Sequence, residues 1–211
     1  AQAPSDLTNW LPPRAAAYVE LDGGVCAERA GALALAQIAR EPEVQEFLKG
    51  ALAMAGMASQ VGLMQLQAQT GLTAEDLQAV LRSRISVTWL GQVVESWQEG
   101  GSSSSRSYPD LILGWEYGED PAVTVEVIES LEDLLRDQGA GSFSDQDLEG
   151  TKIRVFTLSA FGRPWDFYYL VEGGRFVFAT RRDTLAEALR LRAAGGGGLA
   201  ADASFVEARA R

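Results

Sequence analysis

The chain has 211 residues, of which 46% are hydrophobic and 22% charged, and its formal net charge is −11. This length and composition suit one folded domain of ordinary to large size, or two small ones, with enough apolar residues for a real core. The acidic balance argues against nucleic acid and anionic membrane surfaces as partners, because both favour lysine and arginine.

The sequence contains no histidine and a single cysteine, Cys26. Histidine is the commonest metal ligand and the usual general base near neutral pH, and it normally activates a cysteine nucleophile. One cysteine forms no intrachain disulfide and no Cys-rich zinc site. We therefore interpret Cys26 as a small buried apolar residue and expect no catalysis, no metal and no other cofactor.

The chain begins with AQAPSD rather than with Met. Small residues are typical of the mature end that signal-peptide cleavage leaves, and a boundary chosen for expression is the alternative. We expect an exported protein in the periplasm or cell envelope. Residues 1–14 are interpreted as a lead-in segment that is anchored to the core by Leu7, Trp10 and Leu11.

A first strand is predicted over residues 15–21, AAAYVEL, which end at an Asp-Gly-Gly turn. Glu20 and Asp22 on this strand could in principle serve as the paired carboxylates of a glycoside hydrolase. Many other pairs in this acidic chain meet the same condition, so the signal is empty. We interpret Glu20 as an outward-facing strand residue and Asp22 as a turn residue of a scaffold.

Two helices are predicted next, over residues 25–41 and from Pro42 to about Gln69. Residues 50–74 carry no charge. Glycines and glutamines dilute this run, so we predict no transmembrane segment in the chain, while membrane attachment by other means stays open. The helix is either buried on most of its surface or exposes a flexible apolar face to a hydrophobic ligand, lipid or protein partner. The residues expected to make that contact are Met54, Met57, Val61 and Met64.

A short helix is predicted over residues 73–82, followed by strands at 84–94 and 110–117. The segment GGSSSS at 100–105 between these strands is predicted to be a flexible loop. Asp120 and Pro121 then favour a helix start, and apolar residues recur after them at helical spacing.

Eleven carboxylates and one basic residue, Arg136, lie between Glu116 and Glu149. The segment 145–150 resembles the start of a calcium loop, but Phe156 stands where the bidentate Glu of such a loop belongs, so we expect no calcium site. The acidic helix within this stretch presents either a solvated face or a docking surface for a basic partner. The docking residues would be Glu126, Glu129 and Asp133.

Three more strands are predicted at 151–159, 165–172 and 175–180, with a tight Gly-Gly turn between the last two. A capping pattern at 180–183 opens a helix that ends near residue 194. Residues 195–211 are interpreted as a Gly-rich spacer and the start of a further helix near Ser204.

Six aromatic residues alternate along the last two strands, which favours a core with one decorated face over a stacking platform for bases or sugars. They are Trp165, Phe167, Tyr168, Tyr169, Phe176 and Phe178. The sequence contains no phosphate-binding glycine loop and no nucleophile elbow. Because hairpins dominate, residues 15–194 are expected to form a single α+β module, with a mainly antiparallel sheet of about six strands and helices packed on one face.

Four segments carry a resemblance: LPPRAAAYVELDG at 11–23, EGTKI at 149–153, VFAT at 177–180, and Leu199, Asp202 and Phe205 with their spacing. Together they resemble a bacterial family of domains of unknown function that occurs in exported or membrane-anchored proteins, often with related α+β modules repeated. Residues 199–208 also loosely echo 38–47, as expected if this chain is one module of a longer protein. The resemblance implies an envelope location and supplies no activity and no catalytic residue.

The sequence thus predicts a non-catalytic, exported binding or structural module of the bacterial cell envelope. It contacts a hydrophobic ligand or partner through the uncharged helix. One alternative is an accessory subunit of a larger envelope or membrane protein assembly, docked through its acidic helix face. A second alternative is a hydrolase that uses carboxylates.

Overall fold

The structure, a computed structural model, describes residues 7–23, 68, 73, 83–99, 101–116, 121–158, 163–195 and 197–209. The chain divides into two compact units. Residues 1–20, 85–116 and 139–211 form the sheet unit, and residues 21–84 and 117–138 form the helix unit. Most of the three helices predicted between residues 25 and 82, including Met54, Met57, Val61 and Met64, lies outside the described residues.

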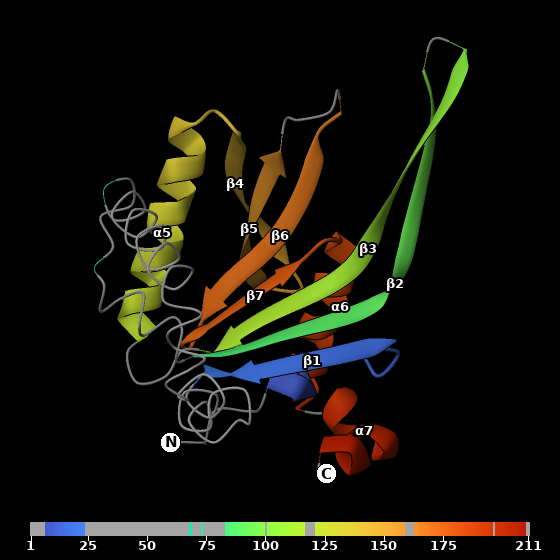
Figure 1. Ribbon diagram of the computed structural model, residues 1–211, viewed down its shortest axis with the longest axis vertical. Helices are drawn as coiled ribbons and strands as arrows, with labels where there is room; N and C mark the ends of the chain where they lie inside the picture. The colour runs from blue at the N-terminus through green and yellow to red at the C-terminus, as the bar shows by residue number, and fades with distance from the viewer. Residues whose placement is uncertain are drawn as a thin grey trace, which may run out of the picture. The chain divides into compact units, whose positions relative to one another are not determined.

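Seven strands form one sheet in the order β1-β2-β3-β7-β6-β5-β4 (Figure 1). Pairing of β7 with β3 and β6, and of β5 with β4 and β6, is antiparallel. This confirms the predicted antiparallel sheet and, with the helices, an α+β organisation. The strands are β1 (Ala17–Asp22), β2 (Arg84–Glu99), β3 (Ser102–Glu116), β4 (Gly141–Leu148), β5 (Thr151–Leu158), β6 (Trp165–Glu172) and β7 (Arg175–Ala179).

The predicted number of about six strands was wrong, because no strand was predicted at β4. Asp145 and Asp147 disfavour strands, but the strand forms through its pairing with β5. Asp145 lies 2.8 Å from the Lys152 ammonium and 3.0 Å from the Arg154 guanidinium of β5. These ion pairs across the strands lower the pKa of Asp145, with the hydrogen bond from Lys152 as the largest cause.

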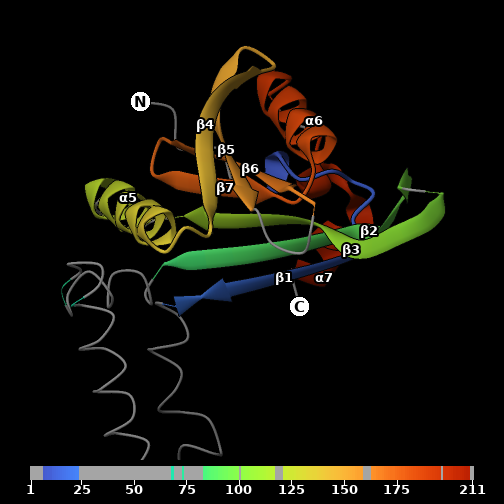
Figure 2. The ribbon, with the colours of Figure 1, turned by 90° about the horizontal axis from the view of Figure 1, so that it is seen from above.

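The flexible loop predicted at 100–105 was also wrong in most of its length. Ser102 to Ser105 belong to β3 and are exposed. The chain turns near Gly101, whose φ of 85° suits glycine. The β2–β3 hairpin therefore extends well beyond the end of β7 (Figures 1 and 2).

The turn between β6 and β7 is confirmed at Gly173 and Gly174, whose φ angles of 59° and 77° a residue with a side chain rarely adopts. After β7 the chain enters α6 (Arg182–Ala193). The helix start was predicted correctly, but Thr180 is not its cap. The Thr180 hydroxyl instead accepts from the Leu111 N–H at 2.9 Å and donates to the Pro109 carbonyl at 3.0 Å.

Helix α6 packs on one face of the sheet in the sheet unit (Figure 2). Its Leu185 and Leu189 are buried against strand residues that include Ile112, Val155 and Val177. Burial of each such side chain stabilises the fold by about 1.5–3 kcal/mol relative to its exposure. One face of the sheet thus carries the main core of this unit.

The lead-in segment joins the same core, as predicted. Leu7, Trp10 and Leu11 are each at most 4% exposed. They lie in and after the 3-10 helix η1 (Leu7–Asn9). The C-terminal segment closes over them, because the Leu199 N–H donates to the Leu11 carbonyl at 2.7 Å. Two short elements complete this segment, η2 (Leu199–Ala201) and α7 (Ala203–Arg209).

The helix unit contains α5 (Pro121–Asp137), as predicted from its apolar spacing. Val127 and Ile128 on this helix are buried. In the same unit, Asp22 accepts from Arg84 at 3.4 Å, so this carboxylate serves the scaffold. Among the described residues, no helix has the length and apolar character needed to cross a membrane.

Candidate functional site

A cleft of about 620 Å³ opens in the sheet unit where β7 ends. Only residues 112–116 of β3 and 168–172 of β6 pair with β7. Beyond Ala179 the chain turns away toward α6, so the free parts of β3 and β6 diverge (Figure 1). The cleft thus lies between the β2–β3 hairpin, the start of β6 and the β7–α6 junction.

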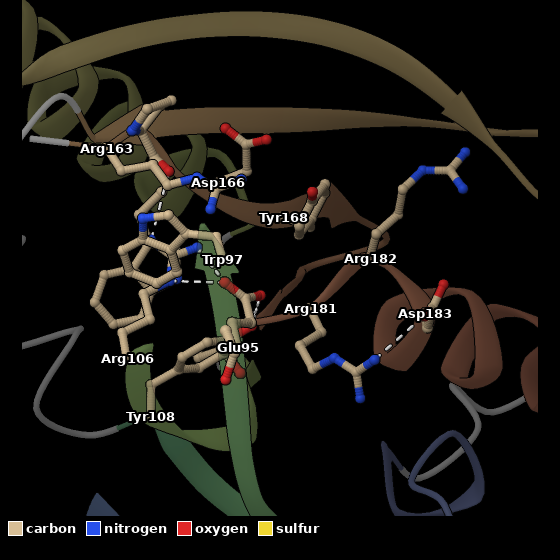
Figure 3. Close-up of a pocket in the computed structure, with 14 residues that line it drawn as sticks. Glu95, Trp97, Arg106, Tyr108, Arg163, Asp166, Tyr168, Arg181, Arg182 and Asp183 are labelled. Carbon is tan, nitrogen blue, oxygen red and sulfur yellow. Dashed lines mark hydrogen bonds and ion pairs between the residues drawn. The ribbon is translucent and has the colours of Figure 1, made fainter. Parts of the chain in front are cut away.

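Aromatic rings and arginines alternate around this cleft (Figure 3). Four arginines and three carboxylates line it, which gives a local formal charge of +1 in a chain of −11. The lining of the cleft is therefore less acidic than the chain as a whole. The arginines are Arg106, Arg163, Arg181 and Arg182, the carboxylates Glu95, Asp166 and Asp183, and the aromatic residues Trp97, Tyr108, Trp165 and Tyr168.

Arg106 connects the hairpin to the start of β6. Its guanidinium lies 2.7 Å from Glu95 Oε2 across the hairpin. It also lies 5.6 Å from the ring centroid of Tyr108 and 5.2 Å from that of Trp165, within the range of cation–π attraction. The Pro164 carbonyl oxygen is 3.5 Å away. Arg106 is thus held on several sides and fixes one wall of the cleft.

Glu95 anchors this wall as an ionised group. The Tyr108 hydroxyl donates to Glu95 Oε1 at 2.5 Å, and this hydrogen bond is the largest cause of the lowered pKa of Glu95. Burial, with the hydrogen bond to Glu95, raises the pKa of Tyr108 to about 12. A general acid of a glycosidase needs a raised carboxyl pKa, so the lowered pKa of Glu95 argues against that role.

A second set of ion pairs holds the β7–α6 junction. Arg181 lies 3.3 Å from Asp183 and 3.5 Å from the buried Asp110. Asp110 also accepts from the Thr184 hydroxyl at 2.7 Å. The carboxylates of Asp110 and Asp183 therefore already occupy the N-terminal end of α6, where a negative charge is favoured.

Four hydrogen-bond donors of the cleft are not used in this way. Among the described residues, Arg163 and Arg182 form no ion pair, and the Tyr168 hydroxyl forms no hydrogen bond. The indole N–H of Trp165 is buried and has no acceptor in the described part of the chain. Arg163 is held over the Trp97 ring, 4.9 Å from its centroid. The remaining carboxylate, Asp166, accepts from the Thr157 hydroxyl at 2.7 Å.

A second cleft of about 500 Å³ lies between β1 and α7. Tyr18 and Phe205 meet edge to face in it, 5.1 Å between centroids. Asp202 accepts from the Ser204 hydroxyl and the Phe205 N–H, which lowers its pKa, and Glu20 accepts from the Tyr18 hydroxyl. Its carboxylates thus hold the local structure, so Glu20 is a scaffold residue, although it faces this cleft rather than open solvent.

The aromatic residues predicted as a core with a decorated face pack mainly on one another. Phe156, Phe167 and Phe178 stack in a row across three strands, with centroids 6.2 and 5.6 Å apart. Phe176 continues this row, 6.5 Å from Phe178. Of the six, only Trp165 and Tyr168 line the first cleft.

Of the residues that the sequence singled out for partner contact, the described ones, Glu126, Glu129 and Asp133, line neither cleft. Glu126, Glu129 and Asp133 are exposed on α5, and Asp133 pairs with Arg136. The cleft residues Glu95, Trp97 and Arg106 were missed. The signal that could have identified them is the alternation of side chains along β2 and β3, but both strands were predicted too short to include these residues.

The contacts of the acidic segment 145–150 do not support a calcium site. Asp145 is engaged by Lys152 and Arg154 as described above. Within the described ranges, no group of three or more His, Cys, Asp and Glu side chains is arranged to hold a metal ion.

Comparison with family models, with curated proteins and with solved structures gives no match for this chain.

Proposed function

We propose that this protein is a non-catalytic, exported binding module of the bacterial cell envelope and that it binds its ligand in the cleft between the β2–β3 hairpin and β6. The observation that carries the proposal is the set of arginine and aromatic side chains that meet there on an otherwise acidic chain. Ligand sites are typically concave and combine aromatic surface with a few convergent polar groups.

Preorganisation supports this function. The wall formed by Arg106, Glu95 and Tyr108 is fixed by ion pairing, hydrogen bonding and ring contacts without any ligand. Side chains that are already ordered lose less conformational entropy when a ligand binds. The envelope location rests on the resemblance of the sequence to exported proteins.

A photo-crosslinking experiment tests the proposal. A benzophenone amino acid replaces Ser96, which is exposed at the cleft, and in a matched control it replaces Ser142, which is exposed on β4. Both proteins are irradiated with fractionated envelope extracts and analysed by mass spectrometry. We expect a defined adduct from position 96 alone. Equal labelling at both positions, or no adduct at either, contradicts the proposal.

The acidic face of α5 supports a second candidate, docking to a basic partner as an accessory subunit. Glu126 and Glu129 are exposed, and the Asp133 side chain is 72% exposed. Glu126→Lys with Glu129→Lys should leave folding unchanged and abolish a crosslink between α5 and a stoichiometric partner. Persistence of that crosslink in the double variant argues against docking through this face.

A further inference from the structure

The unpaired groups of the cleft indicate what kind of ligand it takes. Arg163, Arg182, the Tyr168 hydroxyl and the Trp165 indole N–H are all hydrogen-bond donors without an acceptor among the described residues. A site with several donors that lack an acceptor matches a ligand that supplies oxygen acceptors. Arginine in particular binds carboxylate and phosphate groups through its planar fork.

The other cations of the cleft do not compete for this role. Arg106 is paired with Glu95, and Arg181 lies near two carboxylates, Asp110 and Asp183. Arg163 and Arg182 are thus the two cations of the cleft that form no ion pair among the described residues. In Figure 3 Tyr168 is drawn between these two arginines.

We infer that the ligand is an anionic molecule with a carboxylate or phosphate group, bound through Arg163, Arg182 and the hydroxyl of Tyr168. This inference rests on the proposed binding function and names the class of ligand for the same cleft. Burial raises the pKa of Tyr168, so its hydroxyl keeps its proton and can donate throughout the neutral range.

Asp166 sets a limit on the strength of anion binding. It lines the same cleft and, among the described residues, has the Thr157 hydroxyl but no cation as its partner. A like charge near the anion weakens its binding. Replacement of Asp166 with Asn keeps the shape of the side chain and removes this repulsion, so the variant should bind anions more tightly.

Calorimetric titration of the whole chain at constant ionic strength tests the inference with two probes, inorganic phosphate and citrate. The phosphate and citrate arms distinguish a phosphate ligand from a carboxylate ligand. Arg163→Gln and Arg182→Gln should each weaken the preferred anion about tenfold or more, as expected for loss of a charge-assisted hydrogen bond. Asp166→Asn should tighten it several-fold. Arg190→Gln is the matched control, since Arg190 is 62% exposed outside the cleft and pairs with Glu149.

Tighter binding by Asp166→Asn cannot arise from misfolding, so this variant keeps the test decisive if the arginine variants are unstable. The inference is overturned if neither anion binds, if Arg190→Gln weakens binding as much as the cleft variants, or if Asp166→Asn has no effect. A crosslinked ligand at position 96 without anion binding would remove the anionic class and leave the binding function. Absence of both results would remove both.

Discussion

Replacement of Arg106 with Ala should destabilise the sheet unit and loosen the cleft. The variant loses an ion pair with Glu95 in which the two side chains are 26% and 39% exposed, so this pair contributes up to about 1 kcal/mol. It also loses the ring contacts with Tyr108 and Trp165, each worth about 0.5–1 kcal/mol at a partly exposed site. The free energy of unfolding should fall by about 2 kcal/mol.

For a chain of this size, such a loss lowers the melting temperature by about 4–8 °C. Differential scanning calorimetry measures it, and quenching of tryptophan fluorescence by acrylamide reports whether the five tryptophans, Trp165 among them, become more accessible on average. Arg190→Ala is the control. Arg190 makes one exposed ion pair, so its loss should change stability by no more than about 0.5 kcal/mol. Equal effects of the two substitutions would refute the reasoning that Arg106 connects the hairpin to β6.

Three further predictions follow from other contacts. The pKa of Tyr108 is raised to about 12 from 10.0, so the stability that its hydroxyl contributes is full below pH 10 and is lost as the pH rises toward 12. In melting curves, the difference in stability between the native chain and Tyr108→Phe should therefore shrink between pH 10 and pH 12. A difference that stays constant over this interval contradicts the prediction. In Gly198→Ala, the added Cβ would lie 2.5 Å from the Asn9 carbonyl oxygen and 2.7 Å from that of Leu11. Urea unfolding should therefore show that the free energy of unfolding falls by about 1–3 kcal/mol. Wild-type stability would mean that the C-terminal segment does not close on the lead-in segment. Thr184→Val removes the hydrogen bond from the Thr184 hydroxyl to the buried Asp110 and should lower the free energy of unfolding by about 1–3 kcal/mol. An unchanged free energy of unfolding in the same urea titration would show that Asp110 does not need this hydrogen bond.

Most strands could be predicted because local signals agree with their pairing. Strands β5 to β7 are rich in the β-branched and aromatic residues that favour strands, and the glycines at 173 and 174 permit a turn that few other residues allow. Strand β4 could not be predicted in this way. Its carboxylates disfavour a strand locally, and only the basic residues of β5 across the ladder compensate for them.

The cleft could not be predicted because it depends on where one strand stops. Residues near positions 95–108, 163–168 and 180–183 meet only because β7 ends at Ala179 while β3 and β6 continue. The sequence shows an aromatic pattern near Trp165 but does not show which rings pack together and which remain at a cleft. Met57 and its neighbours were predicted as contact residues because their segment carries no charge, and they lie outside the described residues.

The claim that the cleft is the ligand site is tested most directly by the indole N–H signals of the tryptophans in a nitrogen-15 NMR spectrum. The chain has five tryptophans, and Trp97 and Trp165 line the cleft, whereas Trp10 and Trp115 are buried outside it. Addition of a fractionated envelope extract should shift the signals of Trp97 and Trp165 in a saturable manner and leave those of Trp10 and Trp115 in place. Saturable shifts at Trp10 or Trp115 alone, or no shift at Trp97 and Trp165 with any fraction, would contradict the claim.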